Sequence, residues 1–299
     1  MKKNKLRMKN TIYPSYFVFG ALVLYLLFLL VPGVMGFYYS FTDWSSYSTD
    51  VHFVGAENFY RIFFDSSRHY TVYIKNTVIF TVVTIILKTV IALLLALLLT
   101  SGIKRFANLH RAIIFLPAVL PLLVVGLVFK SILHPTTGIL NLFLRTVGLD
   151  FLAQRWLVDV DWALFSVIGV DTWKGVGYLM VILIAGLQAI PNDYYEAARI
   201  DGANALQALW HITLPLLMPA IMVVTVLNLL YGLKVFDIVW VLTNGGPGYA
   251  TETVYTAVFK DFSKGYYGIA TALSTMLFVI MVSFGYFVIW LMHKEGTDF

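Results

Sequence analysis

No cysteine occurs among the 299 residues of the sequence. A chain without thiols forms neither disulfides nor thiolate sites for zinc and iron–sulfur clusters, and it has no cysteine nucleophile. Its six histidines are scattered, without the short spacing that is typical of metal ligands. These absences exclude thiol chemistry and give no sign of a metal site.

Charged residues are also scarce. Asp, Glu, Lys and Arg make up 12% of the chain, whereas hydrophobic residues make up 60%. A soluble globular domain contains roughly 25% charged residues, so this composition predicts a protein of the lipid bilayer. The net charge of +5 would suggest nucleic-acid binding in a soluble protein, but around apolar segments it reports membrane orientation instead. We expect no nucleic-acid partner.

Six apolar segments are each long enough to cross a bilayer as a helix, which takes roughly 20 residues. They cover approximately residues 14–40, 73–100, 112–133, 162–188, 214–242 and 267–292. Continuous apolar runs exclude the alternating pattern of β-barrel strands. The sequence therefore predicts an all-α membrane protein with six transmembrane helices, organised as an N-terminal tail (1–13) and a single transmembrane domain (14–299).

Lysine and arginine are concentrated on one side of the predicted membrane. Six spans place both termini on the same side, and that side holds ten basic residues: Lys2, Lys3, Lys5, Arg7, Lys9, Lys104, Arg105, Arg111, Arg199 and Lys294. The three opposite loops, 41–72, 134–161 and 243–266, together hold six. Because basic residues favour the cytoplasmic side, we expect both termini in the cytoplasm.

Two kinds of sequence pattern are missing. No internal repeat is convincing, which speaks against carriers built on inverted repeats. No G-x-x-x-x-G-K-[ST] loop, the pattern that cradles nucleotide phosphates, occurs in the chain. If ATP drives transport through this protein, the ATPase is a separate polypeptide.

The segment between the fourth and fifth spans, residues 191–215, is typical of two short helices joined by a tight turn. Asn192 suits a helix start, and Gly202 suits the left-handed residue that ends that helix. Asn204, followed three residues later by Gln207, forms a relaxed capping-box pattern for a second helix. The sequence predicts a structured helix pair lying beneath the membrane.

Residue types alone leave two interpretations of this helix pair open. Glu196 and Arg199 could be an exposed pair three residues apart, worth a few tenths of a kcal/mol, and the alanines could simply favour helix. Small side chains around the bend also permit the close approach of a partner surface. Pro215 suits the first turn of the fifth span, where its missing N–H costs nothing.

The whole motif resembles the EAA loop of ABC-importer permeases. The residues that carry the resemblance are Glu196, Ala197, Ala198, Asp201, Gly202, Ala203, Ile212, Leu214 and Pro215. In that family the loop is a pair of coupling helices that seats in a groove of the cytoplasmic ATPase. The resemblance implies that this chain couples to an ATPase through Glu196, Ala197, Ala198, Asp201 and Gly202.

The resemblance extends over most of the chain. It includes Phe53-Val54-Gly55-Ala56-Glu57-Asn58-Phe59, Gly138-Ile139-Leu140-Asn141 and Thr243-Asn244-Gly245-Gly246-Pro247. These segments are similar to the carbohydrate-uptake branch, and the Gly-Gly-Pro is similar to that of the first permease in importers of maltose and glycerol-phosphate type. The very large external domain of the maltose permease is absent, so ordinary loops would contact the binding protein.

The resemblance implies a type I ABC-importer permease fold in a bacterial or archaeal cytoplasmic membrane. It implies three kinds of protein partner: a second, related permease that forms a heterodimer with this chain, two copies of a cytoplasmic ATP-binding subunit, and an extracellular solute-binding protein. ATP and Mg²⁺ would bind to the ATPase, so we expect no cofactor, catalytic residue or metal ligand on this chain. The substrate would be a mono- or oligosaccharide.

Charged side chains inside the predicted spans are candidates for function, because each costs roughly 2.5–3.5 kcal/mol at bilayer depth. Asp171 and Lys174 lie three residues apart on one helix face, as do Lys234 and Asp237. For the second pair, near the outer end of span five, we favour mutual neutralisation. Lys88 has no acid nearby in the sequence, so its partner is Asp171 or a group on another chain.

Spans four and five each carry a polar and aromatic stripe. The stripes consist of Asp171, Gly175 and Tyr178 on one helix, and Asn228, Tyr231 and Val235 on the other. In the maltose-type permease the sugar lies midway across the bilayer between the two helices that flank the EAA loop. The resemblance therefore implies a substrate site made by Asp171, Gly175, Tyr178, Asn228 and Tyr231.

Other interpretations of these features stay open. Glycine, tyrosine and asparagine in membrane helices also serve close packing and interhelical hydrogen bonds. A secondary transporter or channel would use the buried charges as an ion relay, but it leaves the capped helix pair unexplained. A membrane-embedded enzyme should show clustered catalytic residues, and none appears. We therefore favour a permease subunit of an ATP-driven sugar importer.

Overall fold

The computed structural model describes residues 15–102 and 105–295, and these residues are almost entirely helical. Within this described part no β-strand occurs, and a single isolated bridge joins Thr42 to Phe53. The all-α prediction is confirmed. The predicted N-terminal tail, residues 1–13, lies outside the described residues.

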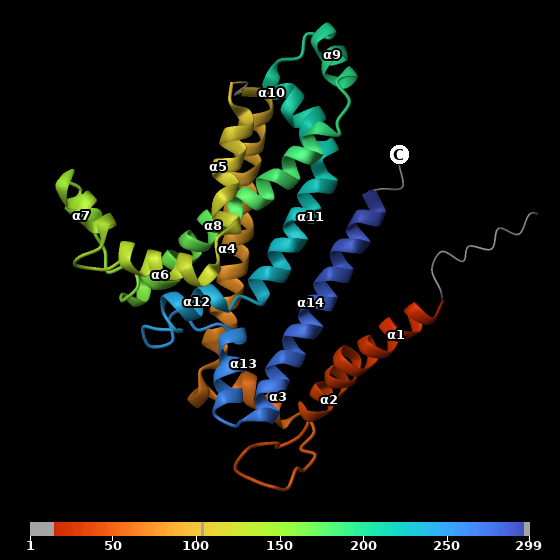
Figure 1. Cartoon of the computed structure of the whole chain (residues 1–299), viewed down its shortest axis with the longest axis vertical. Helices are drawn as coiled ribbons and strands as arrows, with labels where there is room; N and C mark the ends of the chain where they lie inside the picture. The colour runs from red at the N-terminus through yellow and green to blue at the C-terminus, as the bar shows by residue number, and fades with distance from the viewer. Residues whose placement is uncertain (1–14, 103–104, 296–299) are drawn as a thin grey trace, which may run out of the picture.

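Long helical rods form the body of the molecule (Figure 1). They are α1 (Ser15–Tyr25) with η1 (Leu26–Leu30) and α2 (Val31–Tyr39), α4 (Tyr70–Leu97) with η3 (Leu98–Gly102), α5 (Ala107–Val119), α6 (Leu122–Ile132), α8 (Val160–Gln188), α10 (Ala205–Ala208) with η5 (Leu209–Thr213) and α11 (Leu214–Leu233), and α14 (Tyr267–Glu295). Among the described residues, five rods are long and apolar enough to span a bilayer, or six if α5 and α6 count as one bent span.

Short elements lie between these rods. They are α3 (Glu57–Phe64), η2 (Ser66–Arg68), α7 (Ile139–Thr146), η4 (Asp150–Leu152), α9 (Asp193–Ile200), α12 (Asp237–Leu242) and α13 (Val254–Ser263). Figure 1 shows α9 and α10 at one end of the bundle, with α3 and α13 at the opposite end. The C-terminal end of α14 points toward the α9 end.

The third expected span is not a single helix. The chain bends by 95° between α5 and α6, at Leu120 and Pro121. Leu120 is extended, with ψ of 138°, because the ring of a following proline disfavours the helical conformation of the residue before it. The expectation of one continuous helix over 112–133 was therefore wrong, although Pro121 is visible in the sequence.

The fifth expected span, 214–242, also has different bounds. The helix begins early, because α10, η5 and α11 run on as one rod over Ala205–Leu233. Pro215 is thus near the start of α11 but inside a longer helix, directly after the π-helical turn η5. The rod ends at Leu233, and α12 is a separate short helix.

This break separates Lys234 from Asp237. Lys234 is the residue that ends α11, and Asp237 is the first residue of α12. Both are exposed residues of the described chain, and no ion pair joins them. The expected mutual neutralisation was wrong, because it required one continuous helix. Val235 likewise leaves the expected stripe and is buried in the core.

The core lies where α4, α8 and α11 pack on one another, with α5 against α8 and α6 against α12. Close approach depends on small residues at the helix crossings. A Cβ atom at position 177 on α8 would lie 2.1 Å from the carbonyl oxygen of Ile114 on α5. By contrast, α1 and η1 have no buried side chain among those described, and this first rod reaches the bundle through contacts of α2 with α14.

Candidate coupling loop and candidate substrate pocket

The turn between α9 and α10 is closed by two backbone hydrogen bonds of the Schellman type. The Ala203 N–H donates to the Ala198 carbonyl at 2.8 Å, and the Gly202 N–H donates to the Arg199 carbonyl at 3.1 Å. Gly202 has φ of +80°, a conformation that costs other residues roughly 1–2 kcal/mol. The predicted helix end at Gly202 is confirmed.

The start of α10 is a complete capping box. The Gln207 N–H donates to Asn204 Oδ1 at 2.9 Å, and the Asn204 N–H donates to Gln207 Oε1 at 2.8 Å. Asn192 precedes α9 as expected but makes no side-chain cap. The bend of this loop is therefore held by bonds between residues close in sequence.

Most residues of the expected coupling motif are at the surface. Glu196, Ala197, Asp201 and Gly202 are exposed, whereas Ala198 is half-buried and faces a cavity of about 550 Å³ beneath the loop. Large apolar side chains are exposed beside the motif, and they are Tyr194, Ile200, Leu206 and Trp210. Ile200 is 87% exposed, so the loop presents an apolar surface with acidic residues among it.

One contact that the sequence did not reveal joins α9 to the membrane rod. The Tyr195 hydroxyl lies 3.1 Å from Thr213 Oγ1, and Thr213 also donates to the Ala208 carbonyl at 3.3 Å. Thr213 is buried and belongs to η5. The Thr213 hydroxyl therefore bonds within the rod and also links α9 to it.

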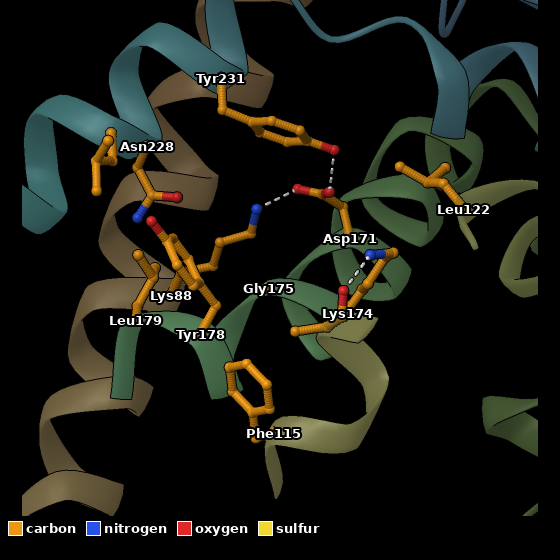
Figure 2. Close-up of a pocket in the computed structure, with 12 residues that line it drawn as sticks. Lys88, Phe115, Leu122, Asp171, Lys174, Gly175, Tyr178, Leu179, Asn228 and Tyr231 are labelled. Atoms are coloured by element: carbon orange, nitrogen blue, oxygen red, sulfur yellow. Dashed lines mark hydrogen bonds and ion pairs between the residues drawn. The ribbon is translucent and has the colours of Figure 1, made fainter. Parts of the chain in front are cut away.

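The second predicted site is one pocket of about 270 Å³ (Figure 2). All five residues of the predicted substrate site line it: Asp171, Gly175 and Tyr178 from α8, and Asn228 and Tyr231 from α11. Lys88 from α4 and Lys174 from α8 line it as well. Residues that the sequence placed on two separate stripes thus share one cavity.

A buried ion pair crosses the pocket. Lys88 Nζ lies 2.6 Å from Asp171 Oδ2, and each side chain is 3% exposed. The Tyr231 hydroxyl donates to Asp171 Oδ1 at 2.8 Å, and the Lys88 ammonium lies 4.7 Å from the centre of the Tyr231 ring. Of the two partners considered for Lys88, the structure selects Asp171, and the cluster ties α4, α8 and α11 together.

Lys174 does not neutralise Asp171, although the two residues lie on the same helix. Its ammonium donates to the Ala118 carbonyl at 3.1 Å (Figure 2). Ala118 lies in the last turn of α5, just before the bend at Pro121. Carbonyls at the end of a helix lack partners within it, and a cation is favourable there.

Gly175 makes room in the pocket for a protein side chain. A Cβ atom at this position would lie 3.0 Å from both Cε and Nζ of Lys88. The glycine therefore allows the lysine to pass α8 and reach Asp171. Gly175 was predicted to belong to a sugar site, and in the structure the Lys88 stem occupies part of the space beside it.

Asn228 contributes an unpaired polar group to the pocket. The residue is 5% exposed, and its Nδ2 is buried without a hydrogen-bond partner among the described residues. Tyr178, which is more exposed, lies near it in Figure 2. Leaving a buried donor unpaired costs about 1–3 kcal/mol, so this amide suits a ligand that carries hydrogen-bond acceptors.

Comparison with known proteins places the chain in a family. The family described as binding-protein-dependent transport system inner membrane component matches residues 88–293. The chain belongs to this family. It is a multi-pass membrane permease, a component of a transport system.

Relatives match the permease along nearly its whole length. It is 36% identical to the probable ABC transporter permease protein YurN of Bacillus subtilis, over 92% of this chain and 94% of the relative. It is 34% identical to the trehalose/maltose transport system permease protein MalF of Thermococcus litoralis, over 94% of each chain. It is 32% identical to the sn-glycerol-3-phosphate transport system permease protein UgpA of Agrobacterium fabrum, over 92% of each.

The fold also occurs in a solved transporter. A chain of a bacterial ABC transporter involved in the import of the acidic polysaccharide alginate matches with a TM-score of 0.78, over 94% of the permease and 95% of that chain. The identity is 24%, so this likeness shows the fold alone. The ABC-importer permease fold that the motifs implied is confirmed.

Other motif residues of the permease hold its loops together. Asn58 is buried and donates from Nδ2 to the carbonyls of Ser40 and Thr42, at 3.0 and 2.8 Å. Asn141 is also buried and donates to the carbonyls of Pro135 and Gln154, at 2.9 and 2.8 Å. Both segments that contributed to the resemblance therefore have an architectural role.

The Gly-Gly-Pro segment is folded around a second ion pair. Lys260 Nζ pairs with the buried Glu252 carboxylate and donates to the Asn244 carbonyl at 2.8 Å. Gly245 has φ of +86°, and a Cβ atom there would overlap Glu252.

In the described part of the chain, no group of three His, Asp or Glu side chains could hold a metal ion.

A third buried carboxyl lies at the α13 end of the permease. The Tyr70 hydroxyl donates to Asp261 Oδ2 at 2.7 Å, and the Arg68 guanidinium lies 4.7 Å from the centre of the Tyr266 ring. Burial raises the pKa of the Asp261 carboxyl above its ordinary value, although the hydrogen bond from Tyr70 opposes this shift.

Proposed function

We propose that this permease is a transmembrane subunit of an ATP-driven importer of mono- or oligosaccharides. The observation that carries the proposal is the α9–α10 loop, whose exposed Glu196, Asp201 and Gly202 come shortly before the membrane rod that begins at Ala205. A loop that only connects two spans needs neither a Schellman turn nor a capping box. A loop that docks a motor needs a rigid, exposed shape.

The substrate class rests on the relatives and on the chemistry of the pocket. One relative is named for trehalose and maltose, and another for sn-glycerol 3-phosphate. The pocket offers a carboxylate, an unpaired amide and aromatic rings, through Asp171, Asn228, Tyr178 and Tyr231. Sugar hydroxyls require hydrogen-bond partners, while the C–H faces of sugar rings pack on aromatic side chains.

The ATPase would bind to the exposed surface of the α9–α10 loop. Glu196, Ala197, Asp201 and Gly202 would contact it directly, and the half-buried Ala198 would support their helix from below. Two copies of the ATP-binding subunit would serve the whole transporter, and ATP with Mg²⁺ would bind there rather than on this chain. This permease would then be a transport subunit that catalyses no bond cleavage itself.

Motion of the loop would reach the pocket through one rigid element. Because α10, η5 and α11 form a continuous rod, a pull on α10 moves Asn228 and Tyr231 with it. The contact between Tyr195 and Thr213 makes α9 move together with the same rod. The pocket would therefore change shape when the ATPase changes shape, which alternates access to the two sides of the membrane.

The remaining partners are inferred from the family to which the chain belongs. A second, related permease would complete the pathway as a heterodimer with this chain, and an extracellular solute-binding protein would deliver sugar to the α3 and α13 end. The α9 end and both termini would then lie in the cytoplasm of a bacterial or archaeal cell, which agrees with the distribution of basic residues.

The proposal is tested by charge reversal in the loop. In the complete transporter, Glu196→Lys should abolish sugar uptake and weaken association with the ATPase, while the permease stays inserted in the membrane. Glu57→Lys, which reverses an exposed carboxylate at the opposite end of the molecule, is the control for ATPase association. Normal uptake by the Glu196→Lys transporter would overturn the coupling assignment, and uptake without any ATPase would favour a secondary transporter.

A further inference from the structure

Lys88 is the one charged group of the pocket that comes from outside the two helices flanking the coupling loop. It belongs to α4, and its ammonium reaches Asp171 through the space left by Gly175. Nothing in the coupling mechanism requires a lysine at this point. A buried ion pair can be replaced by apolar residues without loss of stability in many proteins, so its presence calls for a function.

The donors of this ammonium are incompletely used. An ammonium has three N–H donors. Among the described residues Lys88 has one anionic partner, Asp171, and one aromatic neighbour, the face of Tyr231. The Lys88 side chain lines the pocket (Figure 2). At least one N–H is therefore available to an acceptor that enters the cavity.

The carboxylate beside it is also incompletely used. A carboxylate has about four lone-pair sites. Asp171 Oδ1 accepts from the Tyr231 hydroxyl, and Oδ2 pairs with Lys88. Two acceptor sites remain, and they lie next to the free donor of Lys88. An N–H donor and a carboxylate acceptor thus stand side by side, separated by the 2.6 Å of the ion pair.

We propose that Lys88 is a specificity-determining residue of the sugar site, and that Lys88 and Asp171 together bind two adjacent free hydroxyl groups of the substrate. One hydroxyl oxygen accepts from Lys88, and the neighbouring hydroxyl donates to Asp171. Hydroxyls can both donate and accept, which suits them to such a mixed pair. The inference rests on the proposed function, because it identifies the sugar chemistry that the same pocket selects.

The pair also disfavours a charged group at this position. A sugar carboxylate or phosphate placed here would meet the Asp171 carboxylate as well as the ammonium. The net charge of Lys88 and Asp171 is zero, and Lys174 is engaged with the Ala118 carbonyl. A neutral diol gains one hydrogen bond from each member of the pair without opening it.

A purely structural role for Lys88 makes a different prediction. In that case the lysine only neutralises Asp171, and its removal slows the transport of every sugar by the same factor. If Lys88 contacts a hydroxyl, its removal matters only for sugars that carry this hydroxyl. The discriminating quantity is therefore the ratio of transport rates for a sugar and for its derivative that lacks one hydroxyl.

The experiment uses the complete transporter in proteoliposomes with its solute-binding protein. Maltose, trehalose, diacetylchitobiose and glycerol 3-phosphate are tried first, and the accumulated compound is compared with each of its monodeoxy derivatives. Maximal transport rates are measured at saturating concentrations of binding protein and substrate, so that the affinity of the binding protein does not affect the measured ratio. The variants are Lys88→Met, the double variant Lys88→Met/Asp171→Asn, and Lys174→Met as the matched control.

The wild-type transporter should carry the parent compound at least about tenfold faster than each of two monodeoxy derivatives, since a hydrogen bond to a charged group is worth about 1.5–3 kcal/mol and about 1.4 kcal/mol is a factor of ten. In Lys88→Met the ratio should fall to about 1 for the derivative that lacks the hydroxyl bound by Lys88, whereas Lys174→Met should keep both ratios. The double variant should also give about 1, and it serves if Lys88→Met fails to assemble, because it leaves no unpaired buried charge.

Two results would overturn the inference. A tenfold ratio that persists for both derivatives in Lys88→Met, or for either derivative in the double variant, would leave Lys88 with a structural role only. Accumulation of none of the four compounds by the wild-type transporter would overturn the sugar assignment itself, and with it the diol site. The failure of the proposed function is thus seen in the wild type, and the failure of the inference is seen in the variants.

Discussion

The coupling loop and the substrate pocket hold their functional side chains in opposite ways. In the loop, bonds between near neighbours such as Asn204 and Gln207 fix the backbone, and Glu196 is left exposed to solvent. In the pocket, the Tyr231 hydroxyl and the Asp171 carboxylate meet from positions 60 residues apart, and a buried lysine balances the charge. The polar side chains of the loop remain exposed to solvent, whereas most polar side chains of the pocket already pair with other groups of the protein.

This difference predicts how each region responds to damage. A substitution on the outer surface of the loop would remove a proposed contact with the ATPase and leave the fold of the permease intact. A substitution in the pocket also changes the balance of buried charge among α4, α8 and α11. Function and stability should therefore separate in the loop and change together in the pocket.

The largest expected effect is on stability, from Asp171→Asn. This change leaves the Lys88 ammonium buried without a counter-charge, which should cost roughly 3–5 kcal/mol. The midpoint of thermal unfolding of the detergent-solubilised transporter measures the loss, and Lys88→Met/Asp171→Asn should recover most of it. Asp201→Asn in the loop, an exposed carboxylate, is the matched control and should stay within about 0.5 kcal/mol of wild type. Equal thermal midpoints for Asp171→Asn and wild type would contradict the expected difference in stability effects between the pocket and the loop.

A smaller effect is expected from Gly202→Ala. The space around this glycine is open, but its φ of +80° makes any side chain cost roughly 1–2 kcal/mol. The strain should distort the turn and reduce ATPase association, while the thermal midpoint of the permease changes little. Gly248→Ala is a matched control, since Gly248 also has positive φ and open space but lies outside the loop, directly after Pro247. An equal loss of ATPase association in both variants would argue against a special role for the loop.

The smallest effect concerns Asp261, which is buried like Asp171 but forms no ion pair among the described residues. Burial raises the pKa of its carboxyl above 3.8, so the folded state binds this proton more tightly than the unfolded chain. The free energy of unfolding should therefore fall as pH rises from about 4 through the raised pKa. Asp261→Asn keeps an acceptor for Tyr70 and should remove that fall, as seen in thermal midpoints between about pH 4 and pH 7. Parallel curves for wild type and variant would contradict this assignment.

Much of the fold could be predicted from hydrophobic runs, because a helix that crosses a bilayer must be both long and apolar. The exceptions lie where local signals compete with hydropathy. Pro121 indicates the bend between α5 and α6, but its neighbours are all apolar, so hydropathy alone predicts one continuous span. The break after Leu233 has no proline to mark it, and there Val235 leaves the helix to be buried in the core.

The pocket could be predicted in part. Helical spacing predicted that Asp171, Gly175 and Tyr178 lie on one face of α8. The family resemblance predicted that this face points toward α11. The partner of Lys88 could not be deduced, since no sequence spacing relates α4 to α8. The contact between Tyr195 and Thr213 was equally hidden, because it depends on how α9 folds back against η5.

The residues of this chain specify its membrane environment, its helical spans and the shape of its coupling loop, because each of these follows from hydropathy or from bonds between near neighbours. The packing of distant helices settled which charges pair, which helices bend and what fills the space beside Gly175. Those outcomes depend on contacts between side chains far apart in the chain, and such contacts exist only once the rods have come together.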